Sequence, residues 1–346
     1  MSGHRVVVIG TGAGGLTASA FLAKEGFEVT ALERSAQVGG FLNSYSCKGY
    51  SFDPGVHYLG QCLPGQAMDR MLGALGLTTA ELLAEMNPDG FDVYRFPDFE
   101  VRMCRGADAY RDRLALQFPK DVKGIDKVFE AIRELDSFER VLEHLQLQGR
   151  LQLSDLWDGI KSAPLFRYIK STYGDFLDHS TTNTQLKAVF AAACGDYGLP
   201  PSRASAFVGL MTLHHFLDGA YFPRGGGGAF RDAIRNVATQ AGAIFRTEAE
   251  VAHIGIEGDR VHSVRLANGE QIEADAVVAA IDPRHVFGAL IAEDAVPEKL
   301  IRRVRNLESS MSILGLNLGV RRDLREIGLG ALNIWDYPSV DIDALF

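Results

Sequence analysis

The sequence predicts an α/β protein in which a Rossmann-like dinucleotide-binding domain is interrupted by a mixed, largely helical substrate domain. A β-α-β pattern with a glycine-rich turn opens the chain. A long run of helical patterns follows, and after residue 216 short strand patterns appear again. We therefore expect the nucleotide domain at residues 1–64 and 216–288, and the substrate domain at 65–215 with further strands at 289–346. The active site would then lie in the crevice between the two domains.

The first expected strand covers residues 5–9 and runs into the pattern Gly-x-Gly-x-x-Gly. In this pattern Gly10 permits the tight turn and Gly12 lets backbone amides approach a pyrophosphate. Gly15 lets the following helix pack closely on the strand, and the phosphates lie at the positive end of that helix. We expect the whole turn to bind a dinucleotide through Gly10, Thr11, Gly12, Ala13, Gly14 and Gly15.

The next expected elements are a helix from Gly14 to Lys24 and a strand at Glu28–Leu32, which leads to Glu33. An acidic residue about twenty positions beyond the glycines binds ribose hydroxyls in Rossmann folds, so Glu33 is the expected ribose ligand. A secretory signal peptide is the alternative for this segment. It is disfavoured because the apolar core is short and interrupted by glycines.

The middle of the chain changes from loop to hairpin to helix. Residues 50–60 are rich in loop-forming and aromatic residues, and two alternating runs separated by Pro97-Asp98 predict a β-hairpin. Apolar residues at helical spacing then predict a series of helices. The expected hairpin strands are 91–96 and 99–103, and the expected helices are 110–118, 125–145, 185–194 and 204–217.

The last third begins with four consecutive glycines, Gly225–Gly228, which open a helix running to Gln240. No Lys-Ser/Thr pair follows them, so a P-loop is excluded. Short strands and two hairpin turns, at 258–259 and 268–269, come next. The expected strands are 245–247, 251–257, 261–266, 271–274, 276–280, 311–318 and 331–335.

Composition narrows the function classes. The net charge of −9 argues against a nucleic-acid partner. No apolar run reaches the roughly 18 residues of a membrane span. The 4 cysteines lack the spacing of a zinc site or a disulfide framework, so we expect no metal and a reducing, cytoplasmic environment. His214 and His215 have no partner at metal spacing and are interpreted as pocket lining or core.

Several motifs further along the chain are similar to one flavoprotein family. They are Phe52-Asp-Pro-Gly-Val-His-Tyr58, Phe118-Pro119, Tyr197-Gly-Leu-Pro200 and Tyr221-Phe-Pro-Arg-Gly-Gly226. With them the chain resembles the phytoene desaturase, carotenoid isomerase and retinol saturase family of FAD-dependent oxidoreductases, and looks closest to the retinol saturase branch. The resemblance implies the FAD-binding fold of the flavoproteins with two dinucleotide-binding domains.

The resemblance also implies roles for individual residues. Arg34, Gly39 and Gly40 would approach the flavin phosphates, and the backbone of Val251 would contact the adenine. Gly55, Val56 and His57 would lie close to the flavin ring, and Ala280 belongs to the same cofactor-binding set. His57 and Arg224 are the candidate catalytic residues, for proton transfer and for anchoring a polar group. A structural or solvated histidine is the alternative for His57, and a solvent-facing side chain is the alternative for Arg224.

The resemblance implies redox chemistry on C=C or C–C bonds of a polyene or isoprenoid lipid: saturation, desaturation or isomerisation. Family members continue beyond the position of Phe346 with a glycine-rich segment that closes around the flavin. We therefore expect a fragment, a truncated product or completion by another chain. The alternatives are an amine-oxidase-like flavoprotein with a soluble substrate, a non-catalytic nucleotide-fold subunit, and a plain NAD dehydrogenase. The sequence does not identify the electron partner.

Residues 156–177 mix aromatic and basic side chains, including Trp157, Lys161 and Arg167. Such a composition suits an interfacial helix that makes peripheral contact with a bilayer. A solvated helix with one packed face is the alternative.

Overall fold

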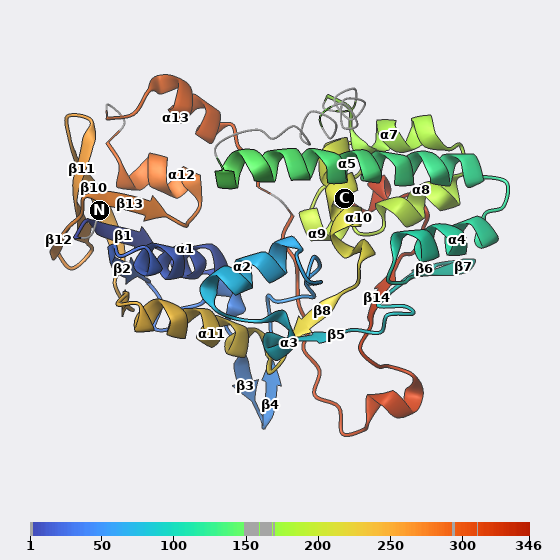
Figure 1. Cartoon of the computed structure of the whole chain (residues 1–346), viewed down its shortest axis with the longest axis horizontal. Coiled ribbons are helices and arrows are strands. Elements are labelled where there is room, and N and C mark those ends of the chain that lie inside the picture. Colours follow the sequence, from blue (N-terminus) through green and yellow to red (C-terminus); the bar gives the residue numbers. More distant parts are fainter. Residues whose placement is uncertain (1–2, 149–158, 160–167, 169, 293–294, 310) are drawn as a thin grey trace.

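The computed structural model describes residues 3–148, 159, 168, 170–292, 295–309 and 311–346 (Figure 1). Its N-terminal part is built on a parallel sheet with the strand order β13-β1-β2-β9. The strands are β1 Arg5–Ile9, β2 Glu28–Leu32, β9 Ile244–Arg246 and β13 Ala276–Ala279. Two of these strands come from the first 32 residues and two from beyond residue 240, so the nucleotide-binding fold is completed by chain that follows a long insertion.

The two faces of this sheet are covered by different elements. Val8 points into a cluster with helices α1, Ala13–Lys24, and α11, Gly226–Gln240. Its neighbours Val7 and Ile9 point the other way because side chains alternate along a strand. There they pack against an antiparallel sheet of strands β10, β11 and β12, whose bounds are Val251–Glu257, Arg260–Leu266 and Gln271–Glu273.

The inserted part has its own hydrophobic core, and its hairpin and helices lie together on one side of the molecule (Figure 1). A hairpin of β6, Asp92–Phe96, and β7, Phe99–Met103, is extended on one edge by β14, Asn333–Asp336, which pairs in parallel with β6. The helices packed with it are α4 Ala107–Gln117, α5 Val122–Gln148, α7 Tyr173–Ser180, α8 Thr184–Ala191, α9 Cys194–Tyr197 and α10 Ala206–Leu217.

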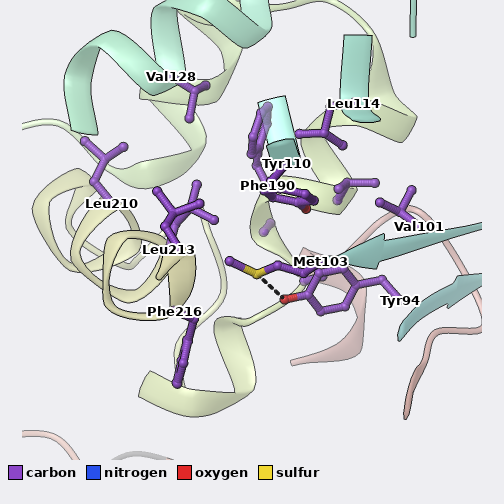
Figure 2. Packing of buried hydrophobic residues seen from close by; sticks show 14 of the residues in the cluster. Tyr94, Val101, Met103, Tyr110, Leu114, Val128, Phe190, Leu210, Leu213 and Phe216 are labelled. Atoms are coloured by element: carbon purple, nitrogen blue, oxygen red, sulfur yellow. Dashed lines mark hydrogen bonds between the residues drawn. The ribbon is translucent and has the colours of Figure 1, made fainter. Parts of the chain in front are cut away.

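Figure 2 shows how the hairpin meets the helices. Tyr94 and Met103 of the hairpin lie beside Phe216 and Leu213 of α10, and the Tyr94 hydroxyl donates to the Met103 sulfur at 3.7 Å. All four side chains are buried, so hairpin and helices form one apolar core.

The remaining elements are short. β5 pairs antiparallel with β8, and β3 pairs antiparallel with β4. The bounds are β3 Tyr45–Cys47, β4 Tyr50–Phe52, α2 Ala67–Leu75, α3 Thr79–Leu82, β5 Leu83–Glu85, β8 Tyr221–Pro223, α12 Pro283–His285 and α13 Glu298–Arg305, with η1 Gly40–Leu42, η3 Val286–Leu290, η5 Leu324–Ile327 and η6 Asp343–Leu345.

The predicted fold class is confirmed: a Rossmann-like sheet is interrupted by a mixed, largely helical part. The predicted strand at 311–318 is wrong. This stretch has no ladder partner within the described residues, and Ile313 and Leu314 are 77% and 98% exposed. Its alternation of apolar residues is typical of a strand, but a strand also needs a neighbour for its backbone hydrogen bonds.

Two other predictions differ from the structure in smaller ways. The predicted helix 185–194 ends at Ala191, and the chain turns before the short α9. The predicted interfacial helix at 156–177 falls largely outside the described residues. The last part of this range, from Tyr173, belongs to α7, Tyr173–Ser180.

We expect replacement of Gly15 by alanine to destabilise the fold strongly, because a Cβ atom there would lie 1.9 Å from the carbonyl oxygen of Gly10. Backbone on both sides must shift, at a cost of about 3 kcal/mol or more. Gly14→Ala is the matched control, since a Cβ at Gly14 meets nothing within 4 Å. Urea denaturation of the two variants measures the difference, and equal stabilities would contradict the close approach.

Candidate functional site

The turn after β1 is held in shape by two glycines. Gly10 has a φ of +87°, which L side chains rarely adopt, and its N–H donates to the Leu32 carbonyl at 2.9 Å. A Cβ on Gly10 would lie 2.9 Å from the carbonyl oxygen of Ala280. Together with the contact between Gly15 and Gly10, this packing brings β1, β2, α1 and the end of β13 together around the turn.

The outer side of the same turn is open. Cβ atoms on Gly12 and Gly14 would meet nothing within 4 Å, and Ala13 is exposed. Gly12 is the N-cap of α1 and supplies no side-chain cap. The first N–H groups of a helix have no acceptor within the helix, and the helix dipole makes this end positive. The open turn therefore fits a phosphate group, which backbone donors can bind.

Glu33 lies beside this turn with its carboxylate already ordered. Thr11 donates to Oε2 through its backbone N–H at 3.1 Å and its hydroxyl at 2.6 Å, and the Ser35 N–H donates to Oε1 at 3.0 Å. Burial alone would raise the pKa of Glu33, but the hydrogen bonds from Thr11 and Ser35 outweigh it and lower the pKa. The ionised carboxylate has about four acceptor positions, so it retains capacity for a ribose hydroxyl.

The segment Gly39–Gly40 lies directly against the turn. A Cβ on Gly40 would lie 3.0 Å from the Cα of Gly12, and the Gly39 N–H donates to the Thr11 hydroxyl at 3.4 Å. Gly39 has a φ of +125° and is held against Arg231 of α11, where a Cβ would meet the Arg231 side chain at 2.5 Å. Both glycines are thus required by the packing, and the exposed Arg34 precedes them.

Val251 begins β10 and is buried. The Ala249 N–H, two residues earlier, donates to the Glu33 carbonyl at 2.8 Å. The backbone near Val251 is therefore tied to the strand end that carries Glu33, whereas the buried Val251 side chain packs in the sheet core.

The four-glycine loop packs against the segment that contains Asp53. The Gly227 N–H donates to the Asp53 carboxylate and the Gly228 N–H donates to the Ser44 hydroxyl, both at 3.0 Å. A Cβ on Gly227 would lie 2.5 Å from Cγ2 of Val56. The absence of side chains on these glycines lets the 42–56 segment pack against the first backbone amides of α11.

The structure brings most of the predicted cofactor residues together, and the segments that carry the two predicted catalytic residues meet through the antiparallel bridge between Leu59 and Tyr221. Gly55 packs on Phe41, next to Gly40, since a Cβ on Gly55 would lie 2.6 Å from Phe41 Cβ. His57 is exposed, with its ring 5.2 Å from that of Tyr58. Arg224 is exposed at the end of β8, and its N–H donates to Leu82. Within the described contacts nothing joins Arg224 to His57.

A buried carboxylate that the sequence analysis missed lies behind Tyr58. Asp92 of β6 is fully buried and accepts hydrogen bonds from the Tyr58 hydroxyl at 2.7 Å, Asn333 at 2.9 Å and Trp335 at 3.0 Å. Burial raises the pKa of Asp92, and these donors oppose that rise only in part. Asp92 therefore links the hairpin to β14 and to the segment that carries His57.

A second missed acid, Asp196 of α9, is less well compensated. Its Oδ2 atom is buried and has no hydrogen-bond partner among the described residues. Burial is the main cause that raises the pKa of Asp196 to about 6; Asp92 raises it further, and His57 lowers it. Asp92 lies on the same face of β6 as the buried Tyr94 and Phe96, so the alternation of the strand could have predicted its burial. The sequence around Asp196 has no such pattern.

The two adjacent histidines on α10 have structural contacts, in agreement with the interpretation of core residues. His215 Nε2 accepts from the Gly60 N–H at 2.9 Å, and His214 Nε2 lies 2.6 Å from Asp136 Oδ1. Cys47, Cys62, Cys104 and Cys194 are all unpaired thiols. In the described part of the chain, no helix combines the length and apolar character needed to cross a bilayer.

Comparison with known proteins identifies a family. Residues 13–334 match the model of the family described as flavin containing amine oxidoreductase. Among curated proteins, the chain is 26% identical to an all-trans-retinol 13,14-reductase of Danio rerio, over 98% of the chain and 58% of the relative. It is 28% identical to a zeta-carotene-forming phytoene desaturase of Myxococcus xanthus, over 94% of the chain and 62% of the relative.

Solved structures show the same fold. An oxidoreductase from Methanosarcina mazei matches with a TM-score of 0.60 at 19% identity, over 88% of this chain and 65% of that one. A putrescine oxidase matches with a TM-score of 0.58 at 17% identity, over 87% of this chain and 63% of that one.

These matches confirm the resemblance stated from the motifs and, through the flavin-containing family, the cofactor FAD. The chain spans about three fifths of the length of the curated relatives, as the 58% and 62% coverages show.

We expect Asp196→Asn to make the protein more stable than wild type at pH 8. A carboxyl with a folded-state pKa of about 6 and an unfolded value of about 3.9 binds more protons when folded, so wild-type stability falls as pH rises through this window. The variant avoids a stability cost on the order of 3 kcal/mol at pH 8 and only a small cost at pH 4, since each pKa unit is worth about 1.4 kcal/mol. Urea denaturation at both values measures it, with the exposed Asp98→Asn as control. A variant less stable than wild type at pH 8 would contradict this burial cost.

Proposed function

Because the chain belongs to the flavin containing amine oxidoreductase family, we propose that it is an FAD-dependent oxidoreductase acting on carbon–carbon bonds of a polyene or isoprenoid lipid. The observation that carries the flavin part is the open helix N-terminus at Gly12 and Gly14, beside the ionised Glu33. The names of the relatives, a retinol reductase and a phytoene desaturase, support the lipid part.

The proposed binding roles follow the geometry of the turn. The N–H groups of the first turn of α1 bind the pyrophosphate, Gly39 and Gly40 close the turn from the side, and Glu33 accepts a ribose hydroxyl. Arg34, Ala280 and the backbone at Val251 complete this end of the site. FAD, when bound, supplies the hydride chemistry that carbon–carbon bonds without a neighbouring heteroatom require.

The proposed reacting end of the site lies at Gly55, Val56 and His57. Gly55 packs on Phe41, which is 82% exposed, and the His57 ring lies at the surface. His57 handles the proton that accompanies each change in the C–C bond order, and Arg224 anchors a polar end of the substrate from β8. The helical part supplies the apolar surroundings of the lipid.

The Gly12→Val substitution is expected to weaken flavin binding while leaving the fold intact. The backbone there is extended, with φ −62° and ψ −175°, and a Cβ meets nothing within 4 Å, so the fold tolerates the side chain. The side chain would fill the position proposed for the pyrophosphate, and FAD affinity should fall at least about tenfold. Titration with FAD followed by flavin fluorescence measures it.

The matched control is Gly73→Val in α2, where a Cβ also meets nothing within 4 Å. Flavin affinity that is unchanged in Gly12→Val and equal to that of the control would contradict the proposed phosphate site.

The substrate class is tested with the flavin-loaded protein. Two assays, both kept free of oxygen, cover the two redox directions. All-trans-retinol should reoxidise chemically reduced flavin if the protein saturates C=C bonds, and phytoene should reduce oxidised flavin if it desaturates C–C bonds, with altered polyenes on chromatography in either case. Putrescine should not reduce the oxidised flavin. Reduction of the flavin by putrescine, with peroxide formed once air is admitted and no polyene product, would instead favour an amine oxidase. One Danio rerio relative at 25% identity is named an inactive retinol reductase, so turnover has to be measured directly.

A further inference from the structure

Phe41 is 82% exposed, although it lies within the candidate flavin site. Exposure alone does not mark a binding residue, because single apolar side chains are common on protein surfaces. Leu116 at the end of α4 is exposed to the same degree, at 84%, and lies in the helical part of the chain. What distinguishes Phe41 is the set of residues that surrounds its backbone and the base of its ring.

The backbone of Phe41 is fixed on both sides. Phe41 is the middle residue of η1, in which the Leu42 N–H donates to the Gly39 carbonyl at 2.9 Å. Gly40 before it lies against Gly12, and Leu42 after it packs on the core formed by α1 and α11. Because successive side chains of a 3-10 turn point about 120° apart, the packing of Leu42 on this core turns Phe41 outward.

The base of the Phe41 side chain rests on Gly55. A Cβ atom on Gly55 would lie 2.6 Å from Phe41 Cβ and 2.9 Å from Phe41 Cδ1, so a side chain there would displace Phe41. One edge of the Phe41 ring therefore lies against the segment that leads to His57, while most of the residue is exposed. Phe41 thus lies between the glycine turn at Gly12 and the segment from Gly55 to His57.

The chemistry of this side chain indicates which part of a dinucleotide it fits. A phenyl ring carries neither a charge nor an N–H or O–H donor, so it is not suited to the diphosphate. In FAD the diphosphate is flanked by adenosine on one side and by the flavin on the other, and the proposed ligand of the adenosine ribose is Glu33. The group that extends from Gly12 toward Gly55 is then the flavin, whose flat aromatic ring can pack on a phenyl ring.

We propose that Phe41 is a binding residue for the flavin part of FAD, and that the bound flavin covers its exposed ring. Phe41 adds an apolar contact to a site that otherwise consists of backbone amides and the Glu33 carboxylate. It therefore favours nucleotides that carry a flavin over adenine nucleotides that lack one. This role rests on the proposed function, since FAD is its ligand.

Thiol labelling of the whole protein tests the contact without any measurement of turnover. Phe41→Cys is made in a Cys47→Ser background, because Cys47 is exposed whereas the other three native thiols, Cys62, Cys104 and Cys194, are buried. FAD at about ten times its dissociation constant for this variant leaves about one tenth of the molecules free, so maleimide labelling of the introduced thiol should slow about tenfold. ADP at the same saturation carries a diphosphate but no flavin, and should leave the labelling rate nearly unchanged.

Leu116→Cys in the same background is the matched control, since Leu116 is as exposed as Phe41 but lies on α4. Its labelling rate should respond to neither nucleotide. A Phe41→Cys thiol that is labelled equally fast with and without saturating FAD would overturn the proposal. Equal protection by ADP and FAD would overturn it as well, because the covering group would then not be the flavin.

Nucleotide affinities provide a second measurement. We expect Phe41→Ser to weaken FAD binding about tenfold, because the aromatic contact is lost, and to leave ADP binding unchanged. Phe41→Tyr retains the ring and should bind FAD as the wild-type protein does. Leu116→Ser is the control and should change neither affinity.

Two other results would count against the proposal in different ways. Equal weakening of FAD and ADP binding in Phe41→Ser would mean that the substitution distorts the glycine turn, and it would overturn a specific contact with the flavin. A wild-type protein that binds no FAD would overturn the proposed function and this role with it. FAD binding by the wild-type protein, without protection at position 41, would overturn the role of Phe41 alone.

Discussion

The close approach of α1 to β1 is the constraint on which the candidate site depends. With no Cβ at Gly15, the helix begins where such an atom would lie 1.9 Å from the Gly10 carbonyl oxygen. This contact sets the direction of the first helical turn relative to the carboxyl ends of β1 and β2. Glu33 at the end of β2 and Gly40 against Gly12 then take positions around one open helix N-terminus.

A second set of contacts ties the segment at 44–58 to α11 on one side and to the inserted part of the chain on the other. Asp53 and Ser44 accept from the amides that start α11, and Asp92 gathers donors from Tyr58 and from β14. Asp92 and Trp335, 243 positions apart in sequence, are therefore joined through this buried carboxylate. Buried networks of this kind stabilise a fold only when their polar groups are satisfied, and Asp92 meets that condition better than Asp196 does.

Local patterns in the sequence were sufficient to predict much of the fold. The turn at Gly10–Gly15, the strand that ends before Glu33 and the hairpin at 92–103 each follow from nearby residues. The strand expected at 311–318 did not form, because alternation describes a side-chain pattern and not the presence of a pairing partner. Asp92 was missed for a related reason, because its hydrogen-bond donors come from β14 and from Tyr58, which are distant in sequence. Asp196 was missed because its burial follows from the tertiary packing of α9 and not from a local pattern.

The central claim is that the glycine turn holds the diphosphate of FAD. A crystal structure of the protein grown with FAD tests it most directly. We predict that the pyrophosphate accepts hydrogen bonds from the first backbone amides of α1 and that an adenosine ribose hydroxyl donates to Glu33. A flavin nucleotide whose phosphates lie away from Gly12 and Gly14, with Glu33 contacting only Thr11 and Ser35, would contradict the account.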